Sequence, residues 1–148
     1  MTLKQWADNG WLKPHKTNRQ EVGNLLVIVR RDLADAQVGG ISPDWRFGIA
    51  YNAALKLCTI LLYAEGYRPT QNLAHYRTLQ ALPLVLGAER KPDADYLDAC
   101  RTKRNTVEYD YAGGATDMDA SELIEFTKTL ETCVLDWVKS RYPDLRMN

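Results

Sequence analysis

The stretch from Ser42 to Gly66 most strongly limits what this chain can fold into, because its apolar residues lie on more than one side of a helix. Ser42 is a favourable N-cap, Pro43 suits the first helical position, and Gly66 is suited to end the helix. The apolar positions are Phe47, Ile49, Ala50, Ala53, Ala54, Leu57, Cys58, Ile60 and Leu61. Such a helix needs neighbours on several sides, so we expect it at the centre of a domain.

Other segments show the three-to-four-residue apolar spacing of amphipathic helices. They run over residues 17–38, 73–86, 92–109 and 119–142, and residues 3–7 add one or two turns before them. Pro83 is expected to kink or end the second of these, and an Asp119-x-x-Glu122 capping box to begin the last. No stretch alternates apolar and polar residues long enough to predict a strand. The pattern predicts an all-α fold, an antiparallel up-and-down bundle of about five or six helices.

Length and composition indicate one domain. The 148 residues suffice to bury a hydrophobic core, and 45% hydrophobic with 26% charged residues is typical of folded proteins. We expect residues 1–148 to form a single domain, with 1–16 as a short N-terminal docking segment and 17–142 as the bundle.

Charge and targeting features limit the partners. The 19 basic and 19 acidic residues cancel, so contact with RNA or DNA must come from a local basic patch. Residues 1–10 contain no apolar signal-peptide core, and the longest apolar run, Leu57 to Ala64, is too short to span a bilayer. We therefore expect a cytoplasmic protein with no membrane contact.

Metal and thiol chemistry have little support in the sequence. Cys58, Cys100 and Cys133 lie far apart inside apolar helical patterns, which predicts buried thiols rather than disulfides or a metal site. His15 and His75 have no partner at metal-ligand spacing. We expect neither a metal nor a cofactor.

Polar chemistry is concentrated in the segment 92–109. One stripe of that helix, continued into the next residues, is formed by Leu97, Cys100, Arg104, Val107 and Tyr111. A guanidinium within such a stripe is costly unless it is paired or faces water. The neighbouring side chains that share these two turns are Arg101, Lys103, Asn105, Glu108 and Tyr109.

Two interpretations of Arg104 are open from the residues alone. In one, Arg104 pairs with Glu108 or another acid and extends to the surface. In the other, Arg104 faces a groove or a subunit interface and holds a phosphate through a bidentate contact. His75 is predicted to cap or pack rather than to act as a base, and Tyr63, Tyr67 and Tyr76 lie near the same helix ends.

The stretch Arg101-Thr-Lys-Arg-Asn-Thr-Val-Glu-Tyr-Asp-Tyr111 resembles the signature of HEPN domains. "WRFGIAYNAALKLCTILLYAEGY" is similar to the HEPN helix rich in alanine and leucine, and "HYRTLQALPLVLG" to the helix that follows it. The resemblance covers about Ser42 to Trp137. In the family motif an arginine is usually followed by a polar residue, with a histidine several residues further on. Arg104 and Asn105 match the first two positions, and Tyr109 stands at the histidine position.

The resemblance implies a small, usually dimeric helical bundle. Many HEPN domains are metal-independent RNases of toxin–antitoxin, antiphage or RNA-processing systems, and their active site forms where two motifs meet across the dimer. By this resemblance Arg104, Asn105 and Tyr109 are the expected catalytic residues. Arg101, Lys103, Glu108, Tyr111 and His75 are then expected to contact phosphate or nucleotide.

The tyrosine at position 109 separates the functional hypotheses. Free tyrosine has a pKa of about 10 and is a poor base at neutral pH, whereas histidine titrates near neutrality. One hypothesis is an RNase in which Tyr109 replaces histidine. The second is a non-catalytic dimeric module that binds nucleotide or RNA, or partners a nucleotidyltransferase. The third is a structural helical domain in which Arg104 forms an internal salt bridge.

Overall fold

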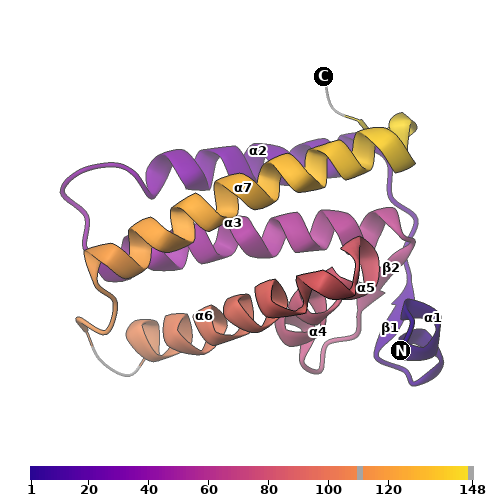
Figure 1. Ribbon diagram of the computed structural model, residues 1–148, viewed down its shortest axis with the longest axis horizontal. Helices are drawn as coiled ribbons and strands as arrows, with labels where there is room; N and C mark the ends of the chain where they lie inside the picture. Colours follow the sequence, from indigo (N-terminus) through magenta and orange to yellow (C-terminus); the bar gives the residue numbers. More distant parts are fainter. Residues whose placement is uncertain (110–111, 147–148) are drawn as a thin grey trace.

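The computed structural model describes residues 1–109 and 112–146, and side chains at all of these positions except 107–109. The protein is an all-α helical bundle, as the sequence predicts (Figure 1). Four long helices run up and down in chain order. They are α2 (Arg19–Asp35), α3 (Pro43–Ala64), α6 (Lys91–Tyr109) and α7 (Asp117–Arg141).

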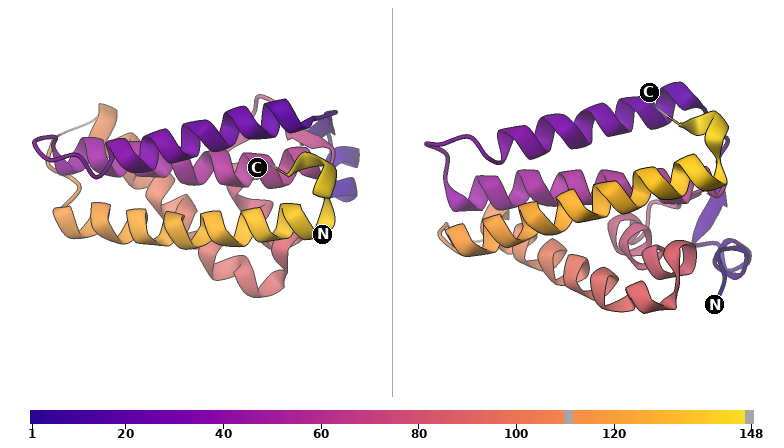
Figure 2. Two further views of the ribbon diagram at one scale, coloured as in Figure 1. Left: turned by 90° about the horizontal axis from the view of Figure 1, so that it is seen from above. Right: turned by 45° about the horizontal axis from the view of Figure 1, so that its top comes forward.

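The helix α3 lies at the centre of this bundle. It packs against α2 and α7 on one side and against α6 and α4 on the other (Figures 1 and 2). Leu57, Ile60 and Leu62 along it are completely buried. Ser42 caps its N-terminus by accepting from the Trp45 amide, and Gly66 follows its end with a φ of 93°. The predicted central helix and its bounds are therefore confirmed.

The helices packed around α3 account for its strongly apolar character. Among the described residues, α3 is the one helix long and apolar enough to cross a bilayer by length and composition, with a mean hydropathy of 1.4. It is thus longer than the apolar run noted in the sequence. However, 72% of the apolar window is buried inside the protein, which is also expected for the core helix of a bundle.

The N-terminal segment packs against one end of α3. Here α1 (Leu3–Asp8) starts at a Thr2 capping box. The strand β1 (Leu12–Pro14) then pairs antiparallel with β2 (Tyr67–Pro69). The sequence did not predict these strands, because three residues are too few to show an alternating pattern. Trp6 and Leu12 form a small cluster with Leu62 of α3.

The expected helix over 73–86 is divided into α4 (Ala74–Gln80) and α5 (Leu82–Leu86), and the 3₁₀ turn η1 (Ala88–Arg90) follows. The break precedes Pro83, so the predicted interruption of this helix is confirmed.

The predicted capping box of α7 is wrong. It consists of Thr116 and Asp119, not Asp119 and Glu122. Two overlapping patterns occur there, and Asp119 is the last residue of the earlier one. After α7 a second 3₁₀ turn, η2 (Pro143–Leu145), follows.

Candidate functional site

The apolar stripe of α6 leads directly to Arg104. Leu97 and Cys100 are buried against the core, and Arg104 is half-buried one turn further along. The Cζ atom of Arg104 lies 5.7 Å from the centre of the Tyr51 ring, which belongs to α3. Arg104 thus lies over an aromatic ring at the edge of the core, where a guanidinium is attracted to the π-face.

Asn105 is directly connected to this arginine. Nη1 of Arg104 donates a hydrogen bond to Oδ1 of Asn105 over 3.3 Å. The two residues that carry the family resemblance therefore form one hydrogen-bonded unit. The side chains of Glu108 and Tyr109, and all of Tyr111, lie outside the described residues, as does any pairing of Arg104 with Glu108.

Arg101 brings a second guanidinium to the same region. Its Nε donates to Oδ1 of Asp98 over 2.8 Å, and its Cζ lies 5.9 Å from the centre of the Tyr76 ring. Tyr76 belongs to α4, so Arg101 lies at the junction of α4 and α6. The pairing with Asp98 holds the guanidinium in place and offsets part of its charge.

His75 reaches this region from α4. Its ring centroid lies 6.4 Å from that of Tyr51, and its side chain is exposed. Partial burial lowers the pKa of His75, and the positive charges of Arg104, Lys56 and Arg101 lower it further. His75 is therefore neutral at pH 7 and can accept a proton. It does not cap α4, whose N-cap residue Leu73 makes no side-chain cap.

Tyr51 forms the floor of the site. Only 1% of the residue is exposed, and burial raises the pKa of its hydroxyl. Within the described part of the chain, the hydroxyl has no hydrogen-bond partner. A buried unsatisfied group of this kind costs about 1–3 kcal/mol, and in native proteins it needs an explanation.

We use the name arginine cluster for His75, Arg101 and Arg104 beside Tyr51, together with Lys56, whose positive charge acts on His75. Sequence reasoning did not identify Tyr51 or Lys56. The available signal was a tyrosine and a lysine within a mostly aliphatic stretch of the central helix. Only the packing of α4 and α6 on α3 brings Tyr51 beside Arg104 and the charge of Lys56 close to His75.

Lys103 is placed differently from the rest of the predicted site. Its Nζ lies 2.9 Å from Oδ2 of Asp119 at the start of α7. A hydrogen bond from the Thr116 backbone, together with Lys103, lowers the pKa of Asp119. The structure therefore directs Lys103 toward α7, whereas Arg101 and Arg104 lie beside the aromatic rings of α4 and α3.

Elsewhere, the described residues give little support for metal-binding or thiol chemistry. Among the side chains that the structure describes, no group of three or more His, Cys, Asp or Glu is arranged to hold a metal. His15 lies 2.6 Å from a carboxylate oxygen of Glu21. Burial raises the pKa of Cys58 to about 12 and that of Cys100 to about 11, so both thiols stay protonated at neutral pH. Cys133 is half-buried rather than buried as predicted.

The arrangement is suited to binding an anion. Two guanidinium groups of α6 and a lysine of α3 place positive charge near the exposed, neutral imidazole of α4, and the buried Tyr51 ring lies beside Arg104. Arginine binds phosphate oxygens bidentately, and an adjacent neutral histidine can accept a proton.

Comparison of the chain with protein-family models, with curated proteins and with solved structures gives no match. The HEPN resemblance thus rests on the motif around Arg104 and the order of the helices.

Proposed function

We propose that this protein is a HEPN-like, RNA-directed protein that holds a phosphate at the arginine cluster and cleaves RNA without a metal. The observation that carries the proposal is the approach of His75 from α4 to Arg104 and Arg101 of α6 around the Tyr51 ring. The imidazole that the motif lacks at Tyr109 is then supplied by another helix. We extend the proposal to a cytoplasmic location and a homodimer.

The chemistry follows from the charges in the cluster. Arg104, oriented by Asn105, binds the non-bridging oxygens of the scissile phosphate and stabilises the charge that grows on them. Neutral His75 takes the proton of the 2′-hydroxyl, and the 2′-oxygen attacks phosphorus. The bond to the 5′-oxygen breaks, this oxygen takes a proton from water, and a 2′,3′-cyclic phosphate remains.

A second candidate is the non-catalytic dimeric module that binds nucleotide or RNA, or partners a nucleotidyltransferase. Two features favour this candidate: tyrosine rather than histidine at position 109, and the pairing of Arg101 with Asp98. Both reduce the number of side chains available for catalysis. In this case the arginine cluster binds the same phosphate but releases it unchanged.

The test is cleavage of a labelled single-stranded RNA with chelator present. We expect cleavage by the wild type, loss of at least about a hundredfold in rate for Arg104→Lys and His75→Gln, and no change for Arg19→Lys. The Arg19 variant is the matched control, because this arginine lies on α2 at the far side of the bundle. Melting curves verify that each variant folds.

The possible outcomes separate the two candidates. RNA binding that depends on Arg104 without cleavage supports the non-catalytic module. Cleavage at full rate by Arg104→Lys contradicts the RNase proposal, and the absence of both binding and cleavage contradicts both candidates. Sedimentation equilibrium tests the homodimer, which predicts twice the chain mass.

A further inference from the structure

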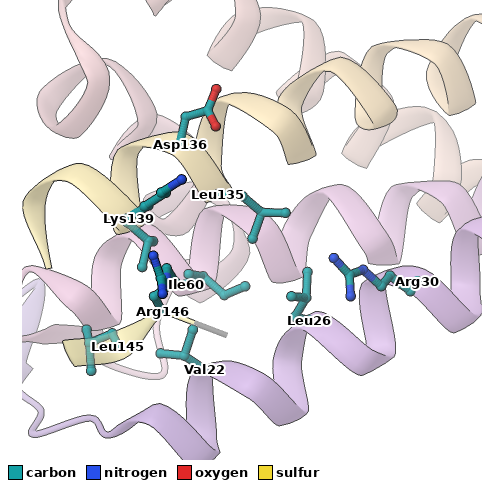
Figure 3. Close-up of a pocket in the computed structure, with 10 residues that line it drawn as sticks. Val22, Leu26, Arg30, Ile60, Leu135, Asp136, Lys139, Leu145 and Arg146 are labelled. Carbon is teal, nitrogen blue, oxygen red and sulfur yellow. The ribbon is translucent and has the colours of Figure 1, made fainter. Parts of the chain in front are cut away.

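A groove on the opposite side of α3 is independent of the arginine cluster. The helices α2 and α7 both pack on α3 and leave between them a cavity of about 300 Å³ (Figure 3). Leu26 of α2, Ile60 of α3 and Leu135 of α7 form its apolar surface, and Leu145 of η2 covers one end. This volume is at the lower end of the range of ligand pockets, roughly 300–1,000 Å³.

Polar contacts hold both ends of this groove. At one end Nε of Arg30 lies 3.4 Å from Oε2 of Glu131, which connects α2 to α7. At the other end the segment with η2 is held by two hydrogen bonds: Arg19 donates to the Asp144 carbonyl over 3.2 Å, and Tyr142 to Glu65 over 3.0 Å. The groove is therefore preformed by these cross-links.

The rim of the groove carries unequal charge. Lys139 and Arg146 are both exposed beside the apolar surface (Figure 3). Neither forms an ion pair with a side chain that the structure describes. Asp136 is the acidic side chain among the lining residues of this cavity. Because Arg30 is already paired with Glu131, two cations and one acid remain available to a ligand.

We propose that this groove binds a single-chain aliphatic carboxylate. The hydrocarbon chain lies along Leu26, Ile60 and Leu135, and the carboxylate is held by Lys139 and Arg146. Charge complementarity selects an anionic head group, and a cavity of about 300 Å³ has room for a single hydrocarbon chain. The site does not involve His75 or Arg104, so its test is independent of the test of the proposed RNase activity.

The test is calorimetric titration with decanoate below its micelle concentration, and with decanol as the neutral comparison. We expect one decanoate per chain and much weaker binding of decanol. Lys139→Glu should weaken decanoate binding by about tenfold or more, since it replaces a charge-assisted contact by repulsion. Arg141→Glu is the matched control: it makes the same charge change in the same last turn of α7 but lies outside the cavity lining.

A filling variant gives the second measurement. Leu135→Trp should abolish binding of decanoate while leaving the melting temperature within a few degrees, because Leu135 is only partly buried. Three results overturn the proposal: no decanoate binding, equal binding of decanol, or equal weakening by Lys139→Glu and Arg141→Glu. A dimer that Leu135→Trp dissociates, with no decanoate binding, overturns it in favour of a second copy of the chain.

Discussion

The Tyr51 side chain is unfavourable as a core residue but is suited to a ligand-binding site. Its ring packs inside the bundle with Arg104 over it, and its hydroxyl has no hydrogen-bond partner among the described residues. A phenylalanine would fill the same volume and leave no polar atom unsatisfied. Without a partner, as among the described residues, the hydroxyl is unfavourable for folding, and the phosphate oxygen of a ligand bound as proposed would satisfy it.

This interpretation predicts opposite effects of Tyr51→Phe on stability and on ligand binding. The variant should be at least as stable as the wild type, and more stable by up to about 1–3 kcal/mol, because an unsatisfied buried group is removed. It should bind RNA more weakly. Urea unfolding and a binding titration measure the two effects. A loss of stability above about 1 kcal/mol would show that the hydroxyl already has a stabilising role in the free protein.

The titration of His75 tests the arginine cluster directly. Its folded pKa lies below the ordinary value of 6.5, so below that pH the unfolded chain binds more protons than the folded protein. The contribution of His75 to stability is therefore lost as the pH falls through this range. We expect an imidazole titration, followed by NMR, with a midpoint below 6.5.

The same titration identifies the source of the shift. Arg104→Gln should move the His75 midpoint upward, because one of the neighbouring positive charges is removed, whereas Arg19→Gln should leave it unchanged. A wild-type midpoint at or above 6.5, or no response to Arg104→Gln, would mean that the two side chains do not share one site.

At the scale of elements, a buried acid connects α2 to α3. Asp32 is only 5% exposed, and Asn52 donates a 2.6 Å hydrogen bond to its Oδ2. Arg31 donates to Oδ1 over 2.9 Å. Since a buried carboxylate is stable only with partners, this contact fixes how the two helices are aligned.

Removal of the amide should therefore destabilise the bundle. Asn52→Ala is expected to cost about 1.5–3 kcal/mol, the usual range for a hydrogen bond to a charged group. Asn24→Ala is the matched control, because Asn24 is an exposed asparagine within α2. Thermal and urea unfolding measure both variants. Equal stability of Asn52→Ala and the wild type would exclude a structural role for this contact.

At the scale of the whole molecule, the balance of charges limits how RNA could be bound in the proposed function. The net charge is zero, so the proposal assigns the local attraction to Lys56, Arg101 and Arg104. Three neutralised phosphates on a single strand predict a slope of about −2 for log K against log salt. Binding titrations between low and moderate salt measure this slope. A slope steeper than about −4 would require a wider basic surface than this cluster.

The sequence by itself determined which segments form helices and identified Arg104 as a candidate site residue. Helical periodicity, Ser42, Pro43 and Gly66 are local signals, so α3 and its bounds could be predicted from adjacent residues. The position of Arg104 within an apolar stripe followed from the same periodicity. Overlapping local signals gave the wrong capping box for α7, because Thr116 and Asp119 offer the same pattern three residues earlier.

Only the tertiary structure determined which residues from distant segments lie close together. The pairing of β1 with β2 joins segments more than fifty residues apart, and strands of three residues carry no periodic signal. His75 and Tyr51 join Arg104 only because α4 and α6 pack on α3, a result of the whole apolar surface of α3 rather than of any one stretch. The groove beside Ile60 likewise exists only where α2 and α7 diverge on that helix. Contacts between distant segments depend on packing, which no local pattern records.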